Sequence, residues 1–207
     1  MTFTPHRLLT QKIQDGFKSL LTPLIKILAK SGISPNTFTL TNVMITSMAA
    51  AALILGQTRI GGCLILIGGL CDSLDGSLAR YGGKVTRFGA LLDSAIDRYS
   101  EFVMFFGIIV HFMTVKDSRT SVIAFLALSG SIMVSYSRAR AESLGFEAKS
   151  GFMQRAERIV FLGAGALFHP LLFKLSIWIV AIFANFTALQ RIYHAYQQDE
   201  TKTTKDK

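Results

Sequence analysis

The sequence predicts an all-α integral membrane protein, with six transmembrane helices preceded by an N-terminal amphipathic interfacial helix. Half of the 207 residues are hydrophobic, and the mean hydropathy is positive. Long uncharged runs alternate with short polar turns, and several runs approach the roughly 20 residues that a helix needs to cross a bilayer. The length allows one domain. We divide it into an interfacial helix (1–32), a six-helix bundle (33–190) and a cytoplasmic tail (191–207).

The N-terminal segment Leu8–Lys30 is predicted to lie in the membrane surface. Apolar residues recur at intervals of three and four, with lysines between them, and Pro23 predicts a kink. A basic amphipathic helix placed before a first span is typical of interfacial binding. An ordinary helix packed against protein remains an alternative.

Three predicted spans follow in the first half of the bundle. A turn at Ser31–Asn36 precedes an uncharged run that continues to Thr58. The second span covers Ile60–Tyr81 and the third covers Phe88–Val115. The short hairpin Gly82–Arg87 joins these two spans, so their connected ends should lie on the same side of the membrane.

The second half of the bundle contains three more predicted spans and a basic loop. The segments are Thr120–Ser137, the loop Arg138–Arg158 with helical ends, and the spans Ile159–Phe173 and Leu175–Gln190, which a turn at His169-Pro170 separates. The tail from Arg191 is polar and is predicted to be disordered at its end.

The net charge of +9 is distributed unevenly over the predicted topology. One side carries the N-terminal basic residues, Arg80, Lys84, Arg87, the loop 138–158 and the tail. The other has Arg59, Lys116, Arg119 and Lys174. By the positive-inside rule, both termini and the hairpin face the cytoplasm. The positive charge therefore mainly sets the orientation in the membrane, and its attraction to anionic lipid headgroups adds to this effect. Because the basic residues form no soluble domain, we predict no nucleic-acid partner.

Four aspartates frame the predicted hairpin. Asp72 and Asp75 are three residues apart, and Asp93 and Asp97 are four apart, so each pair shares one helix face. Carboxylates gathered beside a membrane are costly to desolvate unless a positive charge lies among them. One or two hard divalent cations, magnesium, manganese or calcium, would supply it.

An alternative is an interfacial belt of ion pairs with Arg80, Lys84, Arg87 and Arg98, which does not explain the regular spacing or the glycines. Glu101 continues the acidic stripe by one turn and is expected to pair with Arg98 or Arg80.

Intramembrane carboxylates also form ion pathways, so a cation or proton transporter is a second class to consider. Here the acids cluster at one membrane face and are not distributed through its thickness. This favours a surface-facing catalytic site. A membrane scaffold with an incidental acidic hairpin is a third alternative.

The stretch from Asp72 to Asp97 reads D-x-x-D-G-x-x-A-R-(x8)-G-x-x-x-D-x-x-x-D. This pattern resembles the signature of the CDP-alcohol phosphotransferases, with every spacer length intact. The resemblance implies a membrane enzyme that transfers the phosphatidyl group of a CDP-linked lipid to an alcohol and releases CMP. It also implies two bound magnesium or manganese ions and a homodimer in the cell membrane, with the active site facing the cytoplasm.

The resemblance assigns roles by position. Asp72, Asp75 and Asp93 would be metal ligands, and Asp97 would be a further ligand or the general base. The residues that would bind the CDP group are Asn36, Thr39, Asp72, Gly76, Ala79, Arg80 and Gly89. From the residues alone, Asn36 and Thr39 fit equally well as helix-capping groups.

The acceptor is predicted from arginines at the cytoplasmic ends of the last three spans. The planar guanidinium of arginine suits phosphate, so a cluster there indicates a phosphorylated acceptor. Plain positive-inside charge is the alternative for any one of them. Three short sequence segments resemble the inositol-phosphate-accepting branch of the family: Ser135–Glu142, Arg155–Arg158 and Gln190-Arg191. The residues that would bind the acceptor phosphate are Arg138, Arg155, Arg158 and Arg191.

That branch implies CDP-diacylglycerol, or an ether-lipid analogue, as donor and myo-inositol 1-phosphate as acceptor. Glycerol 3-phosphate, or another alcohol, remains an alternative acceptor. Two positions depart from the branch, because residue 138 is often lysine there and residue 156 is often proline.

Overall fold

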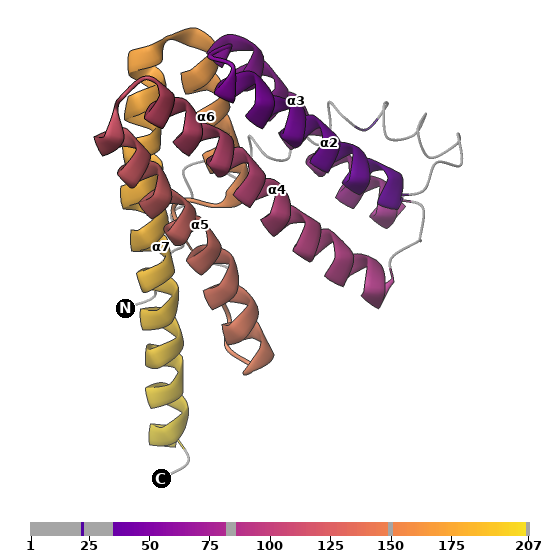
Figure 1. The fold of residues 1–207 in the computed structure, drawn as a ribbon. Coiled ribbons are helices and arrows are strands. Elements are labelled where there is room, and N and C mark those ends of the chain that lie inside the picture. The colour runs from indigo at the N-terminus through magenta and orange to yellow at the C-terminus, as the bar shows by residue number, and fades with distance from the viewer. Residues whose placement is uncertain (1–21, 23–34, 82–85, 149–150, 206–207) are drawn as a thin grey trace.

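A computed structural model of the protein describes residues 22, 35–81, 86–148 and 151–205, and these residues form helices without any strand (Figure 1). The helices are α2 (Pro35–Ile54), α3 (Thr58–Tyr81), α4 (Arg87–Thr114), α5 (Ser118–Ser143), α6 (Arg155–Phe168) and α7 (Pro170–Lys205). The predicted interfacial helix lies outside the described residues apart from Thr22. Residues 82–85 of the predicted hairpin lie outside them too.

The all-α prediction is confirmed in the described residues, and each predicted span corresponds to one helix. The boundaries of the last two segments were wrong. Helix α6 ends at Phe168 and not at Phe173, and α7 begins at Pro170 and not at Leu175, then continues beyond Gln190 to Lys205. Helix α5 continues to Ser143, which agrees with the helical ends predicted for the loop 138–158. The predicted turn at His169-Pro170 is confirmed, because α6 ends at Phe168 and α7 begins at Pro170.

Two of these helices are long and apolar enough to cross a membrane. They are α5, over Ser118–Ser143, and α7, over Pro170–Glu200, while α2 contains a shorter apolar stretch at Leu40–Ile54. Six membrane crossings therefore stay a prediction. Figure 1 shows α7 as the longest rod, extending past the other helices at its C-terminal end.

The helices pack as a closed ring. Helix α2 packs against both α3 and α4, α6 lies between α3 and α7, and α5 contacts α7 and α4 (Figure 1). This arrangement makes α2 the shared support of the two helices that carry the aspartates. Its buried face includes Ala49 and Ala50, whose small side chains let the neighbouring backbones approach.

Glycines mark two of the closest helix contacts. A Cβ atom on Gly107 of α4 would lie 2.6 Å from Cα of Ala50 on α2. A Cβ atom on Gly62 of α3 would lie 2.6 Å from the carbonyl oxygen of Gly163 on α6. Both distances are below van der Waals contact, so a larger residue would force the backbones apart. These contacts hold α4 on α2 and α6 on α3, and so set the spacing of the helices around the site.

The turn between α4 and α5 is fixed by Asp117. Its carboxylate caps α5 by accepting a hydrogen bond from the Thr120 amide (3.2 Å), and it pairs with Lys174 Nζ on α7 (2.5 Å). The hydrogen bond from Lys174, followed by those from Thr120, lowers the pKa of the Asp117 carboxyl. The pair ties α7 to the turn where α4 ends.

Candidate active site

Three of the four predicted metal-ligand aspartates meet in the structure. Asp72 comes from α3, and Asp93 and Asp97 come from α4. One carboxylate oxygen from each lies within 4.8 Å of the other two, and all three residues are half-buried. Oxygen ligands at such separations can converge on one hard divalent cation, which prefers carboxylates at about 2.0–2.6 Å. The residues present therefore fit the magnesium or manganese that the sequence predicts.

Local structure at the start of α4 aims its two aspartates at α3. Thr86 is extended and caps the helix, and its hydroxyl accepts a hydrogen bond from the Gly89 amide at 2.9 Å. From this start, Asp93 and Asp97 follow one turn apart on the same face. A Cβ atom on Gly89 would lie 2.8 Å from the Thr86 hydroxyl, so a larger residue would displace this capping side chain.

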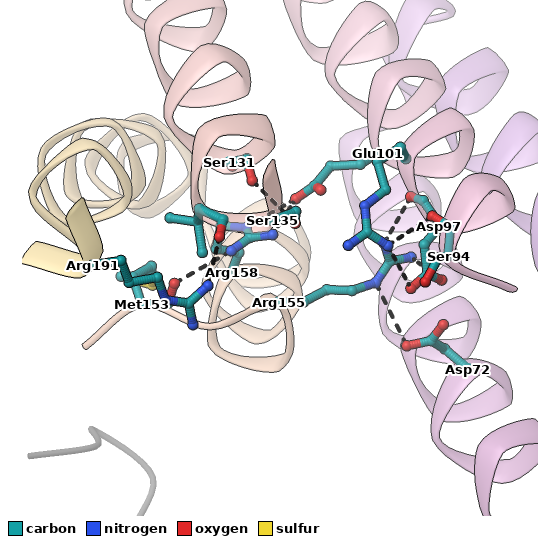
Figure 2. A network of polar contacts seen from close by, with 12 residues as sticks. Asp72, Ser94, Asp97, Glu101, Ser131, Ser135, Met153, Arg155, Arg158 and Arg191 are labelled. Carbon is teal, nitrogen blue, oxygen red and sulfur yellow. Dashed lines mark hydrogen bonds and ion pairs between the residues drawn. The ribbon is translucent and has the colours of Figure 1, made fainter. Parts of the chain in front are cut away.

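Arg155, the first residue of α6, bridges the aspartates (Figure 2). Its guanidinium lies 3.1 Å from Asp97 Oδ1 and 3.5 Å from Asp72 Oδ2, and it donates a hydrogen bond to the Asp97 carbonyl at 2.7 Å. Arg98, the neighbour in sequence, makes only a longer contact to the other oxygen of Asp97, at 3.5 Å. The guanidinium of Arg155, which comes from a helix distant in sequence, thus lies beside the predicted metal ligands.

A second ion pair lies beside this one, deeper in the protein. Arg158 is fully buried, and its Nε and Nη2 contact Glu101 Oε1 at 2.9 and 2.8 Å. The predicted partner of Glu101 was Arg98 or Arg80, and Arg98 instead contacts Asp97 and the Ser94 carbonyl. The helix spacing explains the correction: Glu101 follows Asp97 by four residues, and Arg158 follows Arg155 by three, so two pairs stack between α4 and α6.

The remaining predicted acceptor-phosphate arginines lie on the α5–α7 side of the site. Arg191 is buried and donates to the Val134 carbonyl at 2.5 Å. Arg138 is exposed and pairs with Glu142 at 2.9 Å. The carbonyl that Arg191 binds belongs to Val134, one turn before Arg138 on α5. Figure 2 shows Arg158 between Arg191 and Arg155. Arg158 contacts Glu101 in the structure, and its predicted role at the acceptor phosphate stays a prediction.

Several predicted site residues are placed by backbone alone. Asn36 and Thr39 lie in the first turns of α2, and Asp75 lies one turn after Asp72 on α3. Their side chains lie outside the described part of the structure, as do those of Ala79 and Arg80 and the surroundings of Gly76. The predicted roles of these residues stay predictions.

A small cavity with a partly polar wall adjoins the bridging arginine, and it was not predicted from the sequence. Its volume is about 20 Å³, roughly the space of one water molecule. Asn42, Thr46, Ser100, Glu101 and Arg155 contribute to its wall. Polar residues at four-residue spacing within an apolar run, such as Asn42 and Thr46, are the sequence signal that could have indicated it.

Comparisons with known proteins agree with this geometry. Residues 32–189 match the family model described as CDP-alcohol phosphatidyltransferase. The chain is 38% identical over 190 residues to the archaetidylinositol phosphate synthase of Pyrococcus horikoshii, covering 91% of this chain and 97% of that protein. It is 35% identical over 189 residues to the phosphatidylinositol phosphate synthase of Mycobacterium tuberculosis, covering 86% of each.

Solved structures of the mycobacterial enzyme share this fold. Its crystal structure with CDP-DAG bound superposes with a TM-score of 0.77 at 29% identity, covering 86% of this chain and 94% of that one. The structure of the same enzyme in complex with manganese and citrate gives a TM-score of 0.77 at 29% identity, covering 84% of this chain and 88% of that one. Neither the transporter nor the scaffold alternative finds support in these matches. The chain belongs to the CDP-alcohol phosphatidyltransferase family and is an enzyme of that class.

Proposed function

We propose that the protein transfers the phosphatidyl group of CDP-diacylglycerol, or of an ether-lipid analogue, to myo-inositol 1-phosphate. The products are phosphatidylinositol phosphate, or its ether-lipid counterpart, and CMP. The carboxylate cluster of Asp72, Asp93 and Asp97, bridged by Arg155, carries this proposal. It combines the ligands for a divalent cation with a guanidinium suited to a phosphorylated acceptor.

Asp72, Asp75, Asp93 and Asp97 would hold magnesium or manganese. Such ions would supply Lewis-acid chemistry, which withdraws charge from the phosphoryl oxygens of the donor and would stabilise the departing CMP. The neighbour solved with manganese supports this assignment. Asn36, Thr39, Gly76, Ala79, Arg80 and Gly89 would bind the CDP group, and the neighbour solved with CDP-DAG supports such a donor.

Asp97 is the proposed general base. The acceptor hydroxyl oxygen attacks the β-phosphorus of the donor, a new P–O bond forms, and the bond from phosphorus to CMP breaks. The hydroxyl proton passes to a carboxylate oxygen of Asp97. This residue contacts Arg155, so the group that removes the proton lies beside the group proposed to bind the acceptor phosphate.

The choice of acceptor is supported by the arginines and by the relatives. Arg155 borders the carboxylates, while Arg191 binds α5 one turn before Arg138. A phosphate group offers negatively charged oxygens that can accept two parallel hydrogen bonds from one guanidinium, whereas a neutral alcohol offers no negative charge to pair with the arginines. The relatives named above are synthases of inositol-phosphate lipids.

We further propose a homodimer in the cytoplasmic membrane, with the active site and both termini on the cytoplasmic side. The basic residues at the ends of α5, α6 and α7 support this orientation by the positive-inside rule. Soluble phosphorylated acceptors would then reach the site from the cytoplasm while the donor tails stay in the bilayer.

An acceptor panel tests the proposed reaction. The purified protein receives CDP-diacylglycerol and Mg²⁺ or Mn²⁺ with inositol 1-phosphate, glycerol 3-phosphate, serine or free inositol, and product lipids are identified by mass. We expect CMP release and a lipid product with inositol 1-phosphate, and loss of both with EDTA. If glycerol 3-phosphate supported turnover and inositol 1-phosphate did not, glycerol 3-phosphate would be the acceptor and the proposed one would be wrong. Turnover without a divalent cation would overturn the metal dependence.

Arg155→Ala is expected to raise the acceptor KM by about tenfold or more, the range for losing a hydrogen bond to a charged group. The donor KM should change by less than threefold, because the donor is held by other residues. Steady-state kinetics with each substrate varied in turn give the comparison, and Arg98→Ala is the matched control at the same carboxylate. Equal effects on both KM values would argue against an acceptor role.

A further inference from the structure

The segment that precedes α6, residues 151–154, is hydrogen-bonded to α7. Met153, two residues before Arg155, is fully buried, and its amide donates a hydrogen bond to the Thr187 hydroxyl of α7 at 3.1 Å. Thr187 is also fully buried. The hydroxyl and the amide therefore meet in a place where water does not compete, and losing either partner would leave the other unsatisfied.

Gly151 makes this contact possible. Its φ of +145° lies in a region that L side chains rarely adopt. A Cβ atom there would lie 2.5 Å from the Thr187 methyl carbon, so the backbone passes directly over the threonine. Thr187 thus holds the segment by its methyl group at Gly151 and by its hydroxyl at Met153.

A second pair of contacts to this connection lies further along α7. The Glu147 amide donates to the Gln198 side-chain oxygen, and the Gln198 side-chain nitrogen donates to the Glu147 carbonyl, both at 2.8 Å. The adjacent Ala148 is buried. Gln198 lies in the part of α7 beyond Gln190 that the sequence predicted as tail. The helical extension therefore supports the chain after α5.

Helix α6 needs this outside support because its own start has no side-chain cap. Gln154 occupies the N-cap position without a capping hydrogen bond from its side chain. The Met153 backbone is instead held at both groups, since its carbonyl accepts from Arg158 Nη1 at 3.3 Å while its amide is bound by Thr187. Arg155 begins the helix that this residue anchors, so a shift of Met153 moves the guanidinium that bridges Asp72 and Asp97.

We propose that Thr187 is a positioning residue, supported by Gln198, which sets the place of Arg155 at the carboxylate cluster. It touches no reacting atom and acts through Met153. The kinetic consequence rests on the proposed role of Arg155 at the acceptor, whereas the structural consequence does not.

Thr187→Val and Thr187→Ser form the test pair. Valine keeps the size of threonine and removes the hydroxyl, while serine keeps the hydroxyl. In Thr187→Val we expect the acceptor KM to rise about two- to tenfold, the range for one lost hydrogen bond, with the donor KM unchanged within twofold. Hydrogen exchange of the 151–158 peptide should accelerate. Thr187→Ser keeps the hydrogen bond to Met153 and loses only the methyl contact at Gly151, so both values should lie closer to the wild type than those of Thr187→Val.

Gln198→Ala should give a smaller change in the same direction, and it keeps the test decisive if Thr187→Val does not fold. Tyr196→Phe is the control on the same stretch of α7, because its hydroxyl contacts only the exposed Glu200 in the structure as described. Equal acceptor KM values in Thr187→Val and Thr187→Ser, or equal rises in both KM values, would overturn the positioning role.

Failure of the proposed function looks different. The wild type would then be inactive with inositol 1-phosphate. The KM values of Thr187→Val and Thr187→Ser would in that case be measured with the acceptor of the panel that gives turnover. The exchange measurement needs no substrate. Unchanged exchange of the 151–158 peptide in Thr187→Val would overturn the inference whatever the acceptor.

Discussion

Asp97→Asn is expected to lower kcat by about 10²- to 10⁴-fold, the usual contribution of a general base. Asparagine keeps the size of the side chain but cannot take the acceptor proton. The carboxylate lies beside Asp72, Asp93 and Arg155, so it is well placed relative to the proposed metal and acceptor sites. CMP release from CDP-diacylglycerol with saturating acceptor gives the measurement.

Binding experiments separate the two roles of Asp97. If it acts chiefly as the base, Asp97→Asn should still bind Mn²⁺ and the CDP-lipid nearly as well as the wild type. Loss of Mn²⁺ binding together with turnover would identify it as an indispensable metal ligand instead. Asp199→Asn, an identical change at an exposed position on α7, should have no effect on kcat. Wild-type turnover in Asp97→Asn would remove this residue from the mechanism.

Arg158→Met is expected to lower the free energy of unfolding by about 3–5 kcal/mol, because removing one member of a buried ion pair leaves the other charge without compensation. The remaining residue, Glu101, is 4% exposed, and its second carboxylate oxygen already lacks a hydrogen-bond partner in the described structure. Thermal or denaturant unfolding in detergent gives the comparison with the wild type.

The double variant Glu101→Leu/Arg158→Met is the matched control. Replacing both charges with apolar groups of similar size should recover most of the lost stability, because buried pairs and apolar replacements are often nearly equivalent. The cycle of two single variants and the double variant isolates the coupling between the residues. A double variant as unstable as the sum of the two single variants would show that the pair does not contribute as a unit.

The two stacked pairs explain how α6 is aligned with α4. Asp97 meets Arg155 at the carboxylate cluster, and Glu101 meets Arg158 in the interior. The inner pair is fully buried and holds the helices, whereas the outer pair is half-buried and faces the site. The two arginines thus differ in burial although they lie within a single turn of α6.

Local sequence pattern determined the helices and the shared face of the aspartates. Apolar runs bounded by polar turns are enough to locate α2 to α7, because a helix that crosses or lines a membrane needs an uninterrupted apolar stretch. Spacings of three and four place Asp93 and Asp97 on one stripe whatever surrounds them. The family signature in the same stretch then indicated the reaction class.

Tertiary structure alone decided which charges meet. Glu101 and Arg158 are 57 residues apart, and no pattern within a helix shows that α6 turns this face toward α4. The same holds for the end of α7, where a polar sequence stays helical while Gln198 binds Glu147. Periodicity fixes which side chains share a face of a helix. The packing of Gly107 on Ala50 and of Gly62 on Gly163 fixes which neighbour that face meets.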